Sequence, residues 1–154
     1  MILPAFNLPP FPFRIVEHED KRRQIFDPLR KKFLLLTPEE WVRQHFIQYL
    51  INEKKFPISL FAIERGIKFS QRTGRFDVMF HNNKTGHPLL LVECKAPNVK
   101  INQETFDQIA RYNMSLKVKY LVVTNGLNHY YCILDVENNK YSFIPDLPLY
   151  QYLQ

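Results

Sequence analysis

The stretch Leu89-Leu90-Leu91-Val92-Glu93-Cys94-Lys95 is an apolar run that ends in an acid and a base. An unbroken run of large aliphatic residues is typical of a strand that is buried on both faces of a sheet. The segment Ala96-Pro97-Asn98 follows at once and does not allow the strand to continue. Because a carboxylate and an ammonium group are costly to remove from water, we interpret Glu93 and Lys95 as residues of a functional site.

A second acid, Asp77, lies in the segment Arg75-Phe76-Asp77-Val78-Met79-Phe80, one expected strand earlier. Side chains alternate along a strand, so Glu93 and Lys95 share one face at a separation of roughly 7 Å, and Cys94 points to the other face. A hairpin between the two strands would bring Asp77 next to Glu93. The sequence therefore predicts a cluster of two acids and one lysine.

This cluster predicts metal-dependent hydrolysis. Two carboxylates roughly 4 Å apart repel each other by roughly 4 kcal/mol at an effective dielectric near 20, so either one is protonated or a cation lies between them. Mg²⁺, for which Mn²⁺ can substitute, fits two carboxylates, the backbone carbonyl of Cys94 and several waters. Lys95 would orient or deprotonate one of these waters, or stabilise charge on a phosphate oxygen. The alternative is a buried ion pair between Glu93 and Lys95, with Asp77 capping a turn.

The rest of the chain predicts a mixed sheet flanked by helices, which is an α/β fold. One helix begins after Thr37, which can cap it, and another begins after Asn102. A helix between two strands favours a parallel pair, whereas the earlier strands favour an antiparallel meander. The expected helices cover residues 37–52 and 102–116, and the expected strands cover residues 58–69, 75–81, 88–95, 119–124, 129–134 and 141–144.

The second expected helix carries a polar group of side chains. Gln108, Arg111 and Tyr112 stand at positions i, i+3 and i+4 and so share one face, which differs from the apolar stripe. A glutamine, an arginine and a tyrosine next to a metal site could contact a substrate phosphate or hold Lys95 in place. The alternative is an ordinary amphipathic helix with a polar shoulder.

Length and composition restrict the class of protein. The 154 residues fit one folding unit with a real core, which we divide into an N-terminal extended arm and basic segment, residues 1–36, and a main domain, residues 37–154. Cys94 and Cys132 have no CxxC spacing and indicate reduced thiols in a cytoplasmic protein. No stretch approaches the roughly eighteen apolar residues of a membrane span, so no membrane partner is expected.

Positive charge is concentrated near the N-terminus. Lys and Arg number 21 against 15 Asp and Glu, and most of the excess lies between Lys21 and Lys32. Such a patch suits a phosphate backbone, and a solvated basic hairpin or loop is an equal alternative. A second basic segment runs from Arg65 to Arg75. The candidate phosphate contacts are Lys31, Lys32, Arg72, Arg75 and Arg111.

Five segments in this order resemble a known family. The segments are Thr37-Pro38-Glu39-Glu40-Trp41-Val42-Arg43-Gln44, Arg75-Phe76-Asp77, Leu91-Val92-Glu93-Cys94-Lys95-Ala96-Pro97, Gln108-Ile109-Ala110-Arg111-Tyr112 and Val123-Thr124-Asn125-Gly126. The resemblance is to the N-terminal nuclease domain of type I restriction enzyme R subunits, within the PD-(D/E)xK superfamily, and it runs from about Thr37 to Leu134.

The resemblance implies a restriction-endonuclease-like fold and a DNA substrate. It implies that Asp77 and Glu93 bind Mg²⁺, that Lys95 serves the hydrolytic water, and that Gln108 and Tyr112 form an extra motif. It further implies other restriction-modification subunits as partners. Phe76 stands where the superfamily name has proline, a position that touches no ligand.

The resemblance also implies an acid from the first helix. Glu40 is the expected residue, with Glu39 and Glu64 as alternatives. A full R subunit carries an ATP-driven translocase, and this chain has no GxxxxGK[ST] loop, so translocation is not expected here.

The leading hypothesis is thus a Mg²⁺-dependent DNA endonuclease without a motor. The alternative is a catalytically silent nucleic-acid-binding or assembly module that keeps the nuclease fold. A glycosidase that uses Asp77 and Glu93 fits poorly, because Lys95 would have no role.

Overall fold

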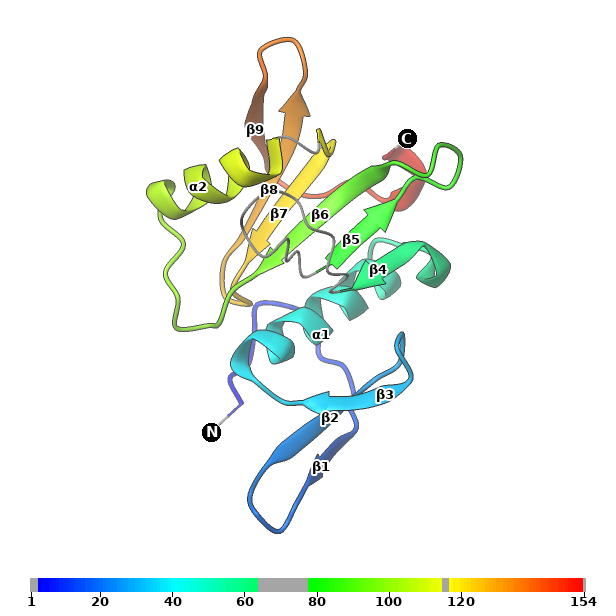
Figure 1. Ribbon diagram of the computed structural model, residues 1–154, viewed down its shortest axis with the longest axis vertical. Coiled ribbons are helices and arrows are strands. Elements are labelled where there is room, and N and C mark those ends of the chain that lie inside the picture. The colour runs from blue at the N-terminus through cyan, green and yellow to red at the C-terminus, as the bar shows by residue number, and fades with distance from the viewer. Residues whose placement is uncertain (1–2, 64–77, 115–116, 154) are drawn as a thin grey trace.

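A computed structural model describes residues 3–63, 78–114 and 117–153. The described residues form an α/β structure with two sheets and two α-helices (Figure 1). In chain order the elements are β1 (Ile15–Glu17), β2 (Arg23–Asp27), β3 (Lys32–Leu35), α1 (Pro38–Asn52), the 3₁₀ turn η1 (Ile58–Leu60), β4 (Phe61–Ile63), β5 (Val78–His81), β6 (Pro88–Cys94), α2 (Gln103–Asn113), β7 (Tyr120–Thr124), β8 (His129–Asp135), β9 (Lys140–Ile144) and the 3₁₀ turn η3 (Tyr150–Tyr152).

The larger sheet has six strands in the order β4-β5-β6-β7-β8-β9. Strands β6 and β7 are parallel, with Glu93 opposite Val123, and the other neighbouring pairs are antiparallel. The expected crossover through the second helix and the expected antiparallel pairing of the earlier strands are both confirmed. The sheet thus consists of two three-stranded antiparallel units that meet at one parallel pair.

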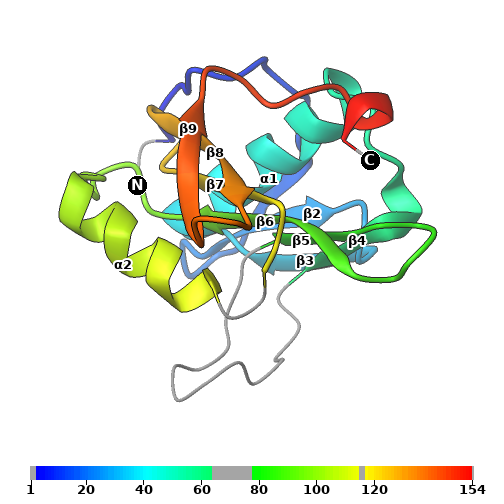
Figure 2. The same ribbon diagram turned by 90° about the horizontal axis from the view of Figure 1, so that it is seen from above.

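The helices cover opposite faces of this sheet (Figures 1 and 2). Helix α1 packs Val42, Phe46 and Leu50 against a face that includes Leu90 and Val92. Helix α2 packs Phe106 and Ile109 against the other face, which includes Met79, Leu91, Leu121 and Val123. Since β6 is covered on both faces, its apolar composition is explained.

Local signals set the beginnings of both helices as expected. The Thr37 hydroxyl accepts a hydrogen bond from the Glu40 backbone N–H at 3.0 Å, and Pro38 occupies the first turn. The Asn102 side chain accepts a hydrogen bond from the Thr105 backbone N–H at 2.8 Å. Among the described residues, no helix is long and apolar enough to cross a membrane.

The N-terminal region holds more structure than an extended arm. Strands β1, β2 and β3 form an antiparallel sheet of their own, here called the N-terminal sheet, which the sequence analysis did not predict. Helix α1 lies between this sheet and the six-stranded sheet (Figure 1). Residues 3–14, here called the N-terminal arm, contain no helix or strand. A smaller error concerns Ile58–Leu60, which form a 3₁₀ turn instead of the start of a strand.

Candidate functional site

Glu93 and Lys95 form an ion pair at the carboxyl end of β6. The Lys95 Nζ lies 3.5 Å from Glu93 Oε1; the Glu93 residue is 5% exposed and the Lys95 side chain is one-quarter exposed. The Lys95 backbone N–H donates to the Thr124 carbonyl at 2.8 Å, so the site is anchored to β7. The structure therefore brings together these two residues, as the sequence predicted.

Glu93 and Lys95 belong to the sheet face that α2 covers. Leu91, two residues before Glu93, packs in the apolar cluster of α2, whereas Val92 and Cys94 pack in the cluster of α1. Alternation along β6 places Glu93 with Leu91 and apart from Cys94. The carboxylate and the ammonium group thus emerge beside the segment that leads into α2.

The second predicted metal ligand lies outside the described residues. Asp77 directly precedes β5, and Glu64, Arg72 and Arg75 are in the same undescribed segment. Among residues 3–63, 78–114 and 117–153, no group of three or more His, Cys, Asp and Glu side chains could hold a metal ion. Of the predicted metal ligands, the structure describes Glu93 and Cys94 but not Asp77, so the metal site stays a prediction.

Glu40 is held in a buried polar network. Its carboxylate is paired with the Arg43 guanidinium one helical turn away and accepts from Gln44 Nε2 at 2.9 Å. A second guanidinium, that of Arg30, reaches Glu40 Oε1 at 3.5 Å. Donors therefore face both carboxylate oxygens of Glu40.

Arg30 connects this network to the N-terminal sheet. Its Nε donates to Asp27 Oδ2 at 2.6 Å, and Asp27, which is fully buried, also accepts from the backbone N–H groups of Leu29 and Arg30. Asp27 thus closes the β2–β3 turn and orients Arg30 toward Glu40. The spacing of Glu40, Arg43 and Gln44 along one helix could have indicated part of this network, but no sequence signal pointed to Arg30.

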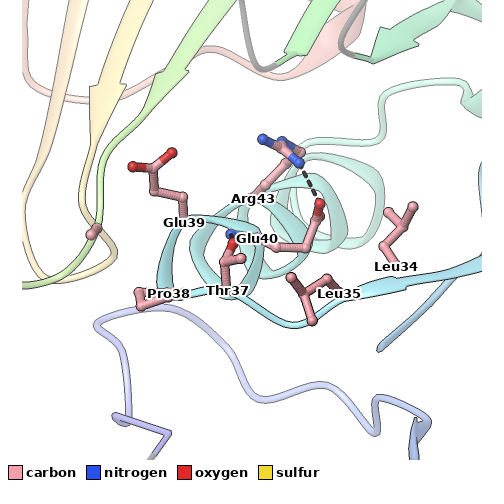
Figure 3. A pocket seen from close by; sticks show the side chains of 8 residues that line it. Leu34, Leu35, Thr37, Pro38, Glu39, Glu40 and Arg43 are labelled. Carbon is pink, nitrogen blue, oxygen red and sulfur yellow. Dashed lines mark hydrogen bonds and ion pairs between the residues drawn. The ribbon is translucent and has the colours of Figure 1, made fainter. Parts of the chain in front are cut away.

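A pocket of about 470 Å³ lies where β3, the first turn of α1 and the end of β6 meet (Figure 3). Figure 3 shows the Glu40 carboxylate turned to Arg43, whereas the Glu39 side chain points in a different direction. Ala96, the residue after Lys95, also lines the pocket. Both first-helix acids therefore reach a pocket that adjoins the segment carrying Lys95.

The remaining predicted residues lie on two surfaces. Gln108 and Arg111 are exposed on α2, on a face that differs from the apolar stripe, as expected; the Tyr112 side chain lies outside the described part of the chain. Lys31 and Lys32 are exposed at the β2–β3 turn.

The fold and this site define an α/β domain with an acid and a lysine at the end of a central strand. A profile of the family "Type I restriction enzyme R protein N terminus" matches residues 38–148. The chain therefore belongs to this family. The matched region begins at α1 and so excludes the N-terminal sheet.

One curated relative is a viral protein. "Uncharacterized protein L3" of Acanthamoeba polyphaga mimivirus is 33% identical over 125 residues, which is 71% of this chain and 17% of that protein. The chain thus spans about a sixth of the length of this relative.

Proposed function

We propose that this protein is a Mg²⁺-dependent DNA endonuclease of the PD-(D/E)xK type, with a restriction-endonuclease-like fold. The observation that supports the proposal most directly is the Glu93–Lys95 pair at the carboxyl end of β6 in a chain of the R-protein N-terminal family. The family links the chain to restriction enzymes in general. DNA and other restriction-modification subunits are the proposed partners.

The residues take distinct roles in this proposal. Glu93 and Asp77 would hold Mg²⁺ together with the Cys94 carbonyl, and the bound ion would supply Lewis-acid stabilisation of the phosphate. Glu93 fits this role because its carboxylate is buried, whereas its partner Lys95 remains partly exposed. Glu40 or Glu39 would complete the acids from α1.

Lys95 would act on the water that attacks phosphorus. Its Nζ can orient that water by hydrogen bonding and stabilise negative charge on the phosphate oxygens as the P–O bond breaks. The attacking water loses a proton to solvent as its oxygen bonds to phosphorus, and the leaving oxygen takes up a proton from solvent, which gives a free hydroxyl and a phosphate monoester end. Gln108, Tyr112 and Arg111 would contact substrate phosphates from α2, and Arg72 and Arg75 from the segment before β5.

A plasmid-nicking assay tests this proposal. Supercoiled plasmid is incubated with Mg²⁺ and either the wild-type protein or Lys95→Ala, and relaxed circles are quantified. We expect at least a hundredfold loss of nicking for Lys95→Ala, in the range of losing one charge-stabilising group. Lys84→Ala, which changes an exposed lysine in the β5–β6 turn, is the matched control and should nick as wild type. Equal nicking by wild type and Lys95→Ala would rule out the proposed site.

The second candidate is a catalytically silent binding or assembly module. The close approach of Lys95 to Glu93 and the donors on both oxygens of Glu40 favour it, because these acids already have cationic partners. Titration calorimetry with MgCl₂ separates the two functions. Heat of Mg²⁺ binding that disappears in Glu93→Gln supports the nuclease, and its absence in the wild type supports the silent module.

A further inference from the structure

The outer face of the N-terminal sheet carries apolar and aromatic side chains, of which Val16 and Leu35 are exposed and Phe26 and Phe33 are half-buried. Strand register places two cross-strand rows on this face: Arg14, Phe26 and Phe33 form one row, and Val16, Gln24 and Leu35 form the next. The opposite face carries the buried Ile25. Leu35 is 56% exposed and Val16 is 37% exposed, so water reaches the outer face.

The aromatic row is built around a cation. The Phe26 and Phe33 rings lie 5.3 Å apart at an interplanar angle of 61°, and the Arg14 guanidinium carbon lies 5.8 Å and 5.3 Å from their centroids. A flat guanidinium over two aromatic rings offers stacking surface that a planar base can share or replace. Such sites bind unpaired bases with little regard for sequence.

Phosphate-binding charge lies at the same end of the sheet. Arg14, Lys31 and Lys32 are exposed, and no carboxylate in the described part of the chain forms an ion pair with them. Lys32 lies opposite Asp27 in the strand register, so alternation places these two side chains on the face opposite the rings; Asp27 is buried and engaged by Arg30. This end of the sheet therefore combines aromatic stacking surface with free positive charge, which is the chemistry of a single nucleic-acid strand.

The face also leads toward the Glu93–Lys95 site. Leu35, in the second row, lines the pocket shown in Figure 3, and Ala96 lines the same pocket. A strand that lies on the aromatic row and crosses Leu35 would thus reach the segment that carries Lys95.

We propose that the outer face of the N-terminal sheet binds single-stranded nucleic acid, with bases stacked on Phe33, Phe26 and Arg14 and a phosphate paired with Lys31. The proposal rests on the proposed function for its substrate class, and it adds a binding surface that lies outside the matched family region. It assigns the N-terminal sheet to the recognition of unpaired strands.

Fluorescence anisotropy of a labelled oligothymidylate of about 20 nucleotides tests the surface, in EDTA so that no cleavage occurs. Phe33→Leu keeps an apolar side chain but removes the aromatic face. We expect it to weaken binding about tenfold, the effect of losing stacking on about one base. Lys31→Ala should lower the slope of log K against log salt by about 0.7, the contribution of one lost phosphate contact on a single strand.

Matched variants outside the surface serve as controls. Phe143→Leu changes an exposed phenylalanine of β9, and Lys84→Ala changes an exposed lysine of the β5–β6 turn. Both should bind as wild type. If Phe33→Leu unfolds at a lower temperature than wild type, Arg14→Gln is measured instead, since its exposed side chain can be changed without opening the core.

The outcomes separate this inference from the proposed function. Weaker binding by Phe33→Leu with intact controls supports the surface even if the wild type nicks no plasmid. No binding of oligothymidylate by the wild type, or equal binding by wild type and Phe33→Leu, overturns it even if nicking is robust. An equal loss of oligothymidylate binding and of duplex binding in Phe33→Leu also overturns it, because paired bases cannot stack on the rings.

Discussion

Glu40 shows how one acidic residue can serve structure at the edge of a site. It is buried, and two guanidinium groups and one amide face its carboxylate. Glu39, its neighbour, is exposed. Charge-assisted hydrogen bonds between buried groups are costly to break one-sidedly, so the two adjacent acids should differ sharply in their contribution to stability.

We predict that Glu40→Ala lowers the free energy of unfolding by roughly 3 kcal/mol, because it removes the carboxylate between Arg43 and Arg30. The matched change Glu39→Ala should alter it by less than about 0.5 kcal/mol, as is usual for an exposed side chain. Urea unfolding followed by circular dichroism measures both values. Equal destabilisation by the two variants would show that the ion pairs of Glu40 do not stabilise the fold.

Among the elements, the N-terminal arm, residues 3–14, is held by hydrogen bonds to the β7–β8 turn of the six-stranded sheet. The Asn7 N–H donates to the Gly126 carbonyl at 3.0 Å, and the Asn7 carbonyl lies 2.9 Å from His129 Nε2. The Trp41 indole N–H donates to the Pro4 carbonyl at 3.0 Å. The arm therefore joins the β7–β8 turn to the first half of α1.

We predict that Gly126→Ala displaces this arm. Gly126 has a φ of 86°, and a Cβ there would lie 2.6 Å from the Phe6 ring. Backbone strain and this clash together should cost roughly 1 to 3 kcal/mol. Trp41 is the single tryptophan of the chain, so its fluorescence emission should shift to the red as the arm leaves.

Gly86→Ala is the control for this change. Gly86 has a similar φ of 72°, but a Cβ there would meet no atom within 4 Å. It should show backbone strain alone and leave the Trp41 emission unchanged. A red shift of equal size in both variants would contradict docking of Phe6 on Gly126.

The elements differ in how far the sequence could predict them. Helix α1 has a side-chain cap, a first-turn proline and an apolar stripe, all local signals. Strands β1 to β3 have three to five residues each, and their pairing depends on the buried Asp27 and on contacts with α1 that no short window shows.

The same distinction holds for the candidate site. Glu93 and Lys95 are two residues apart on one strand, so alternation alone brings them together. The link from Arg30 to Glu40 joins a turn to a helix, and it depends on how the N-terminal sheet docks. Contacts of this kind need the tertiary structure.

At the scale of the whole molecule, the buried His45 and the half-buried His129 join segments that are far apart in sequence. The His45 ring lies among Phe6, Phe13 and Trp41, at 4.8, 4.7 and 4.1 Å between ring centroids. His129 lies between the Thr124 hydroxyl at 2.7 Å and the arm. Burial lowers the pKa of His45 and of His129 below the ordinary value.

We predict that stability falls as the pH falls below about 6.5, the usual histidine pKa in an unfolded chain. Because folding lowers both pKa values, the unfolded chain binds protons more readily, and the stabilisation present above that pH is lost toward more acidic solution. Urea unfolding at pH 7.5, 6.5 and 5.5 measures the slope. His45→Gln should flatten it, whereas His87→Gln, an exposed position, should not. An unchanged slope in His45→Gln would exclude the buried ring as its source.

The single parallel pair in the large sheet has a consequence for the order of folding. Strands β7 to β9 join through tight turns, as do β5 and β6, so these units can form from contacts that are near in sequence. Pairing of β6 with β7 must wait for the crossover through α2, and such non-local closure is slow. Glu93 and Lys95 lie on that seam. In a nascent chain, the site at Glu93 and Lys95 would thus be completed only when β6 pairs with β7. The proposed nuclease activity would appear only after that step.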